Sequence, residues 1–168
     1  MWFRSKFLIA TASSADKARR AADAGADLVL DYRDADLAGR VAAFAAGGGV
    51  DHVVDVDFGG NLAATVECIK PGGSIAFYAS RGNPAPDLPV RQFIRKNLSL
   101  RAVGLPHAAA EERRAAQAGL SNWLATATRP CFQIAARVSL AETAIAHELV
   151  ERGDKRGTVT VTIDSTVG

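Results

Sequence analysis

Short apolar runs, rich in valine, leucine and isoleucine, recur through the first part of the chain and are separated by polar or glycine-containing segments. The runs are nearly continuous instead of alternating, which is typical of strands buried on both faces of a parallel sheet. The pattern therefore predicts a parallel sheet that is covered on both sides. The expected strands lie at residues 7–11, 28–31, 50–56, 74–80 and 98–104.

The segments between these runs carry the signals of helices. Ser13 and Asp16 have the S-x-x-D spacing in which a serine hydroxyl caps the free amides of a helix start, and Gly25 is placed to end that helix. Alternation of strands and helices predicts an α/β fold with a doubly wound parallel sheet. The other expected helices lie at residues 37–46, 61–70 and 90–96, with a turn at 71–73.

The rhythm changes after Pro106. A long helix rich in alanine and polar residues is expected at 108–128, and a strand, a helix and a closing strand are expected after it. We therefore expect two parts, a doubly wound part at residues 7–106 and a C-terminal helix–strand extension at residues 107–168. The later elements are expected at residues 134–138, 141–152 and 158–163.

Length and charge narrow the classes of protein. The 168 residues suit one ordinary domain with a real core. Basic and acidic residues number 20 and 18, for a net charge of +2, which predicts no affinity for nucleic acid or for an anionic membrane. No apolar stretch is long enough to span a bilayer. We expect a cytoplasmic protein.

Cysteine and histidine spacing offers no site for a metal or a nucleophile. Cys68 and Cys131 are far apart in the sequence and outside any C-x-x-C pattern, so both are expected to be reduced, buried thiols. His52, His107 and His147 each lack the companions that a catalytic triad or a zinc site requires. We therefore assign no catalytic side chain and no metal ligand.

The end of the first expected strand carries the most informative polar residues. Ligands of a doubly wound sheet bind beyond the carboxyl ends of its strands, and NAD-binding folds usually place an acidic residue here for the ribose hydroxyls. Ser13, Ser14 and Lys17 occupy this place instead, with Tyr32 and Arg33 ending the neighbouring strand. Two hydroxyls, free amides and an ammonium group suit an anion such as a ribose 2′-phosphate. A capped helix start with a solvated lysine is the other interpretation.

Several motifs, in order, resemble one family. They lie at residues 10–18, 24–33, 53–60, 70–74 and 151–159. From Phe7 onward the chain resembles the Rossmann-like cofactor domain of zinc-independent medium-chain dehydrogenases/reductases, in the branch of the quinone oxidoreductases and zeta-crystallins. The order and spacing of the motifs carry this resemblance, because each motif alone is only moderately specific.

The resemblance implies NADPH as the cofactor and direct hydride transfer to a quinone or to an activated carbonyl or alkene, without a protein nucleophile. It places residues 55–60 beside the adenosine and pyrophosphate, and residues 77–80 against the nicotinamide. Taken alone, Asp55 can equally be a turn cap, the two glycines a helix entry and Phe77 a core residue. The residues that match the family's cofactor contacts are Ser13, Ser14, Lys17, Tyr32, Asp55, Gly59, Gly60, Phe77, Tyr78, Ala79 and Ser80.

The match begins one unit later than the family's fold does. The first strand and its glycine-rich turn, which holds the pyrophosphate, have no counterpart in the sequence. In strand order 3-2-1-4-5-6 that strand is central, so the strands at 7–11 and 50–56 each lose a ladder of hydrogen bonds. Three explanations of the missing strand remain open. The chain is a fragment of a longer reductase, one piece of a split assembly, or a rearranged remnant whose flanking strands pair directly.

Two functions follow from these expectations. The first is NADPH-dependent reduction, with this chain supplying the cofactor-binding portion and lacking turnover by itself. The alternative is a non-catalytic reductase remnant that acts as a dimerisation or protein-interaction module. In either case a homodimer is expected, formed through the edge strand from Leu98 to Gly104.

Overall fold

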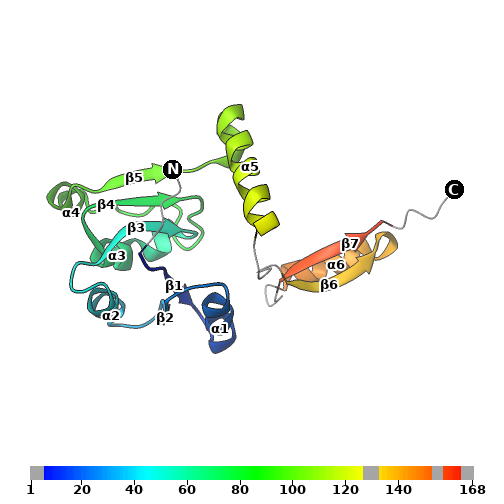
Figure 1. Cartoon of the computed structure of the whole chain (residues 1–168), viewed down its shortest axis with the longest axis horizontal. Coiled ribbons are helices and arrows are strands. Elements are labelled where there is room, and N and C mark those ends of the chain that lie inside the picture. Colours follow the sequence, from blue (N-terminus) through cyan, green and yellow to red (C-terminus); the bar gives the residue numbers. More distant parts are fainter. Residues whose placement is uncertain (1–5, 127–132, 153–156, 164–168) are drawn as a thin grey trace. The chain divides into compact units, whose positions relative to one another are not determined.

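The computed structural model describes residues 6–126, 133–152 and 157–163. The chain divides into two compact units, Met1–Ala118 and Gly119–Gly168, which are described separately. The first unit alternates strands and helices, as Figure 1 shows. Its elements are β1 (Ile9–Ala12), α1 (Ala15–Asp23), β2 (Leu28–Asp31), α2 (Leu37–Phe44), β3 (Val50–Asp55), α3 (Phe58–Cys68), β4 (Ile69–Phe77), α4 (Val90–Lys96), β5 (Ser99–Ala102) and a short 3₁₀ helix (Leu105–His107).

The strands of the first unit form two parallel sheets. One has the order β1-β2 and the other β3-β4-β5, with β5 at an edge. These strands and helices confirm the expected α/β class with parallel pairing. Within the described residues, β1 pairs with β2 alone and β3 with β4 alone. The two strands that would flank a central strand therefore do not close on each other.

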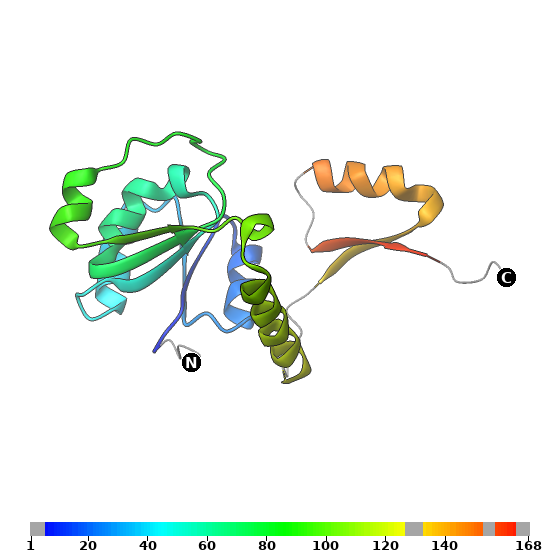
Figure 2. The ribbon, with the colours of Figure 1, turned by 90° about the horizontal axis from the view of Figure 1, so that it is seen from above.

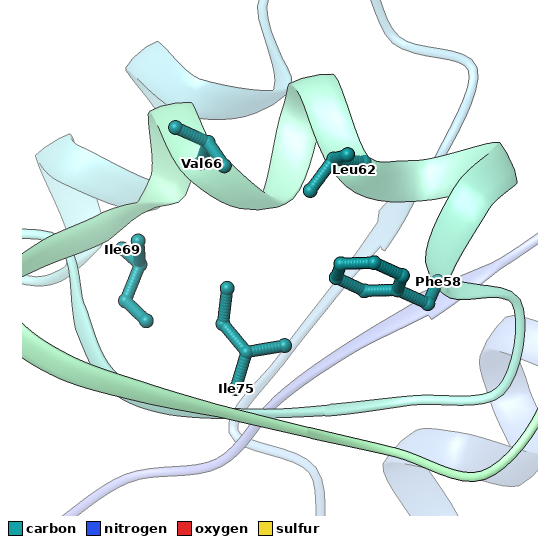
Figure 3. Packing of buried hydrophobic residues seen from close by; sticks show 5 residues of the cluster. All are labelled: Phe58, Leu62, Val66, Ile69 and Ile75. Carbon is teal, nitrogen blue, oxygen red and sulfur yellow. The ribbon is translucent and has the colours of Figure 1, made fainter. Parts of the chain in front are cut away.

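The larger hydrophobic core lies between α3 and the β3-β4-β5 sheet. Phe58, Leu62 and Val66 recur every four residues along α3 and so share one face of that helix. They pack toward Ile69 and Ile75 of β4, as Figure 3 shows. Both isoleucines are 1% exposed, and burial of such a side chain stabilises a fold by about 1.5–3 kcal/mol. This core fixes the ends of β3 and β4 relative to the start of α3.

A second core holds the two sheets of the unit together. Leu30 of β2, Leu37 and Val41 of α2 and Cys68 of α3 are buried against one another. Residues of β1 and β3 pack against the same cluster. Cys68 is a free thiol in this apolar site, as expected, and burial raises its pKa. Cys131 lies outside the described residues.

The expected turn at residues 71–73 is wrong. These residues belong to β4, which begins at Ile69 directly after α3 ends. The pairing with β3 instead shifts register there: Val50 lies opposite Ile69, and His52 lies opposite Ser74. Gly72, with φ of +78°, supplies a conformation that other residues rarely adopt. The irregularity is thus absorbed inside a strand.

The helix α5 (Ala110–Thr126) spans the boundary between the units, and the second unit continues with β6 (Ile134–Ser139), a 3₁₀ turn (Leu140–Glu142), α6 (Thr143–Glu151) and β7 (Thr158–Thr162). β6 and β7 pair in parallel, and α6 lies along one side of the pair (Figure 2). The start of this helical segment is a capping box, in which Glu142 accepts hydrogen bonds from the amide and hydroxyl of Ser139. The expected C-terminal elements are therefore all present.

Candidate functional site

The predicted site residues fall into two groups, each at the carboxyl ends of two strands. The β1–β2 cluster contains Ser13, Ser14 and Lys17 after β1, and Asp31, Tyr32 and Arg33 at the end of β2. The β3–β4 cluster contains residues 55–61 at the end of β3 and residues 77–83 at the end of β4. The contacts within the two clusters differ in kind.

Ser14, and not Ser13, caps helix α1. The Ser14 side chain accepts a hydrogen bond from the amide of Lys17 at 3.3 Å, so the expectation that Ser13 is the cap is wrong. Ser14 directly precedes α1 and Ser13 stands one residue before it, so both are close enough to cap the helix. The extended backbone of Ser14 makes this residue the cap. The Ser13 hydroxyl instead accepts a hydrogen bond from Lys17 Nζ at 3.1 Å. The lysine ammonium is thereby drawn back over the start of α1.

Arg33 connects the ends of β1 and β2. Its Nε and Nη2 donate to the two oxygens of Asp31 at 2.9 and 2.6 Å, and Nη2 also donates to the Ser13 carbonyl at 2.9 Å. Its guanidinium carbon lies 5.8 Å from the centre of the Tyr32 ring. Hydrogen bonds from the Arg33 side chain and amide lower the pKa of Asp31 to about 2. Asp31 is therefore a full anion at neutral pH.

The β1–β2 cluster is open to solvent and carries two cations. The side chains of Arg33 and Asp31 are 60% and 44% exposed, and Tyr32 is 49% exposed. Hydroxyl, ammonium and guanidinium donors lie together beside the amino end of α1, where free amides and the helix dipole favour negative charge. This arrangement has the donors that a phosphate group accepts.

In contrast to the exposed charged groups of the β1–β2 cluster, Asp55 of the β3–β4 cluster is buried and hydrogen-bonded within the protein. It is 5% exposed, and one carboxylate oxygen accepts from the amide of Asp57 at 2.8 Å and from Asn61 Nδ2 at 2.9 Å. The other oxygen accepts from the hydroxyl of Thr65 at 3.3 Å. One of these three donors, Asp57, lies in the turn before α3, and the other two lie within α3. Asp55 thus holds the entry into α3, and its assignment as a cofactor contact stays a prediction.

The loops after β3 and β4 are packed directly against each other. Ser80 Oγ accepts from the amide of Gly59 at 2.9 Å and donates to the carbonyl of Asn83 at 2.6 Å. A Cβ atom at Gly59 would collide with that same carbonyl oxygen. Asp57 ties the loops a second time, because its carboxylate accepts from the amide of Gly82 at 2.8 Å. Gly59 is therefore required for close approach of two backbones, whether or not a ligand is also present.

The end of β4 places neighbouring residues on opposite faces. Phe77 stacks on Phe58, with ring centres 4.4 Å apart and planes at 19°, and so belongs to the core. Tyr78 is 60% exposed, while the carbonyl of Ala79 accepts from the amide of Phe58 at 3.0 Å. Tyr78 is the residue of the predicted 77–80 stretch whose side chain is most available to a ligand.

Sequence reasoning missed the roles of Asp31, Asp57 and Asn83. The D-Y-R spacing at the end of β2 is a signal that could have pointed to the first, because residues two apart on a strand end share a face. Asp57 and Asn83 act through backbone partners in a different loop. Nothing in a single sequence indicates which loops meet.

Across residues 6–126, 133–152 and 157–163, no three histidine, cysteine or acidic side chains come together as a metal ion would require. Over the same described ranges, no helix has the length and apolar character needed to cross a membrane.

Comparison with models of known families shows to which family the chain belongs. The sequence model described as zinc-binding dehydrogenase matches residues 7–121. The chain belongs to the zinc-binding dehydrogenase family. The matched range contains both strand-end clusters, so both belong to the family's domain. The chain matches no curated protein with significance.

Solved structures of similar fold include oxidoreductases with different named cofactors. Mycobacterial Rv1454c complexed with NADPH is 28% identical, with a TM-score of 0.78 over 94% of this chain and 50% of that one. An NAD-dependent alcohol dehydrogenase is 26% identical, with a TM-score of 0.78 over 94% of this chain and 44% of that one. A mycobacterial quinone oxidoreductase is 30% identical, with a TM-score of 0.75 over 91% and 48%. This chain thus spans about half the length of these proteins, and they establish the Rossmann-like fold of its first unit.

Proposed function

We propose that this chain is the cofactor-binding portion of an NADPH-dependent oxidoreductase of the zinc-independent quinone oxidoreductase type. The substrate class is a quinone or another activated carbonyl or alkene. The observation that carries the proposal is the β1–β2 cluster, in which Lys17 and Arg33 both bind Ser13 at the place where an NAD-specific fold carries an acidic residue. The similar structures name both NADPH and NAD, so the choice between cofactors depends on these side chains.

Charge and hydrogen-bonding capacity favour the phosphorylated cofactor. A ribose 2′-phosphate is a dianion that accepts several hydrogen bonds, and a charge-assisted contact of this type contributes on the order of 1.5–3 kcal/mol. Ser13, Ser14 and Lys17 are the residues that we propose to hold this phosphate, with Tyr32 beside the adenosine. The ribose hydroxyls of NADH are uncharged and both donate and accept hydrogen bonds, so the cationic donors of the cluster gain less from them than from a phosphate.

The remaining predicted contacts extend along the same ends of the strands. We propose that residues 77–80 lie beside the nicotinamide, with the exposed ring of Tyr78 as the nearest side chain. When bound, the nicotinamide supplies a hydride for reduction of the substrate. The chain's own residues bind and orient the cofactor, and none is proposed to act as nucleophile or metal ligand. Asp55, Gly59 and Gly60 are proposed to contribute mainly by fixing the loop that borders the pyrophosphate.

This chain by itself is proposed not to turn over substrate. The chain spans about half the length of the similar structures, and the motifs that it shares with the family do not include the glycine-rich turn that holds a pyrophosphate. Orientation of nicotinamide and substrate can supply roughly 7–11 kcal/mol of a reaction barrier, and a cofactor bound mainly at its adenosine end lacks that orientation. We further propose a cytoplasmic location. Residues 7–106 are proposed to form a truncated NADP-binding domain, and residues 107–168 to form the segment that in the family returns to the catalytic domain.

Titration of the purified chain with NADPH and with NADH tests the cofactor assignment. The expected result is a preference for NADPH of roughly tenfold or more, since one charge-assisted contact already corresponds to that factor. Lys17→Ala should shrink the difference between the two affinities, while Lys70→Ala, at the start of β4, should leave it unchanged. Equal affinities in the unmutated chain would contradict the proposal.

A second candidate function is a non-catalytic dimerisation module. The exposed strand β5 favours it, because that strand is an edge of its sheet and every one of its residues is exposed. Sedimentation at micromolar concentrations should show a dimer that Leu100→Pro, in the middle of β5, converts to monomer. A dimer together with no measurable binding of either dinucleotide would favour this second function over the first.

A further inference from the structure

We propose that Arg33 is a further specificity-determining residue for the ribose 2′-phosphate, and that Asp31 is a built-in counter-charge that limits this specificity. The inference rests on the proposed function, because it concerns the same cofactor site. It goes beyond that function by assigning opposite effects to two neighbouring residues at the end of β2.

Ser13 brings the two cations of the β1–β2 cluster to one place. Its hydroxyl accepts from Lys17 Nζ at 3.1 Å, and its carbonyl accepts from Arg33 Nη2 at 2.9 Å. Lys17 reaches Ser13 from α1, whereas Arg33 reaches it from the end of β2. An anion that binds at the Ser13 hydroxyl therefore has both the Lys17 ammonium and the Arg33 guanidinium close to it.

Arg33 is held in place by more than its ion pair. Besides Asp31, it is anchored by the Ser13 carbonyl and lies 5.8 Å from the centre of the Tyr32 ring. The Nε and Nη2 groups make these hydrogen bonds, and no described residue accepts a hydrogen bond from Nη1. Relative to the described residues, both N–H groups of Nη1 are available to a ligand. A guanidinium with fixed orientation and spare donors is well suited to a phosphate.

Asp31 neutralises much of the charge that Arg33 would otherwise present. The ion pair is bidentate, so Lys17 alone supplies the cluster's net positive charge. A phosphate bound beside Arg33 also experiences the Asp31 carboxylate, which repels it. Loss of the Asp31 charge leaves Arg33 anchored at Ser13 and Tyr32 and removes that repulsion. The pair thus sets the 2′-phosphate preference below the value that two unopposed cations would give.

Binding of two small probes isolates the 2′-phosphate. Adenosine 2′,5′-bisphosphate and 5′-AMP differ by this group, and their affinities for the chain can be measured by calorimetry or by NMR. Arg33→Ala should weaken the bisphosphate roughly fivefold, a magnitude typical of an exposed charged contact, and leave 5′-AMP unchanged. Arg33→Lys should fall between, because lysine keeps the charge and loses the fork of donors. Asp31→Asn should strengthen the bisphosphate by a similar factor, and this gain should shrink in high salt.

The Asp51–Lys70 ion pair provides a matched control. It is also exposed, Lys70 likewise lowers the pKa of Asp51, and it lies at the starts of β3 and β4 instead of at strand ends. Asp51→Asn and Lys70→Ala make the same charge changes as the test variants and should alter neither affinity. Circular dichroism of every variant establishes that it is folded, and Arg33→Lys replaces Arg33→Ala should the latter fail to fold.

The outcomes separate this inference from the proposed function. An unmutated chain that binds 5′-AMP as tightly as the bisphosphate would refute the proposed function, and the inference with it. A chain that prefers the bisphosphate, but whose affinity is unchanged by Arg33→Ala or reduced by Asp31→Asn, would overturn the inference alone. The second result would mean that Asp31 acts as an anchor and not as an opposing charge.

Discussion

The two strand-end clusters were assigned the same kind of role from the sequence, yet they are built in opposite ways. In the β1–β2 cluster the charged groups are exposed, and Arg33 and Lys17 are joined through a single serine. In the β3–β4 cluster the carboxylate of Asp55 is buried and accepts three hydrogen bonds from within its own turn and helix. The first cluster has donors left for a ligand, whereas the second uses its polar groups to hold two loops together.

The difference implies that substitutions in the two clusters should separate stability from binding. A change in the β3–β4 cluster should lower the free energy of unfolding, because it removes internal partners of buried groups. A change in the β1–β2 cluster should leave that free energy nearly unchanged and alter affinity for an anionic ligand.

Asp55→Ala should cause the largest loss of stability. It leaves the amide of Asp57, the side-chain amide of Asn61 and the hydroxyl of Thr65 without their acceptor in a buried site. We expect the free energy of unfolding to fall by about 3 kcal/mol or more, measured by urea denaturation. Asp31→Ala, which also removes a carboxylate at a strand end, should cost less than about 1 kcal/mol. Equal losses for the two variants would remove the contrast between the clusters.

Gly59→Ala should come next. The new Cβ would meet the carbonyl oxygen of Asn83 and would lie 2.7 Å from Ser80 Oγ, so the loop after β4 must move away. We expect a loss of about 1–3 kcal/mol, as for other overpacked sites. Gly48→Ala is the control, since its Cβ would lie 3.8 Å from the nearest backbone oxygen. A Gly59 variant as stable as the Gly48 variant would show that the two loops can separate freely.

Much of the fold could be predicted because it depends on local patterns. Near-continuous apolar runs located all five strands of the first unit, and Gly25, with φ of +108°, does follow the end of α1. The prediction failed where geometry beyond the local pattern decides. Residues 71–73 have the composition of a turn, yet they continue β4 because Val50 pairs with Ile69 ahead of them.

The candidate site could be predicted only in part, for a related reason. The sequence indicates which residues lie at strand ends, and Lys17 with Ser13 confirms that polar groups gather there. It does not indicate whether a carboxylate such as Asp55 turns inward, because that depends on donors ten residues away in α3. It also leaves Ser13 and Ser14 equivalent as caps until the backbone is known.

Two serines permit the same substitution in both clusters. Ser80 Oγ links the amide of Gly59 to the carbonyl of Asn83, so Ser80→Ala removes two hydrogen bonds between loops. We expect a loss of about 1–2 kcal/mol in the free energy of unfolding. Ser13→Ala should change that quantity by less than about 0.5 kcal/mol, as surface substitutions usually do, and should weaken NADPH binding. The reverse order of stabilities would contradict the comparison.

The smallest expected effect is on the titration of Asp31. Arg33 lowers the pKa of this carboxyl to about 2 from an ordinary value of 3.8. Since the pKa is lower in the folded chain, the ion pair's contribution to stability is fully present above pH 3.8 and is lost as the pH falls toward 2. Both side chains are largely exposed, so the transition at acid pH should be slight in the unfolding free energy and visible mainly in the carboxyl chemical shift by NMR.

Arg33→Ala should return the Asp31 pKa toward its ordinary value and leave the pKa of Asp51, which Lys70 holds low, unaffected. An Asp31 that titrates normally in the unmutated chain would mean that Arg33 is not held against it in solution, and would contradict the opposing role assigned to Asp31.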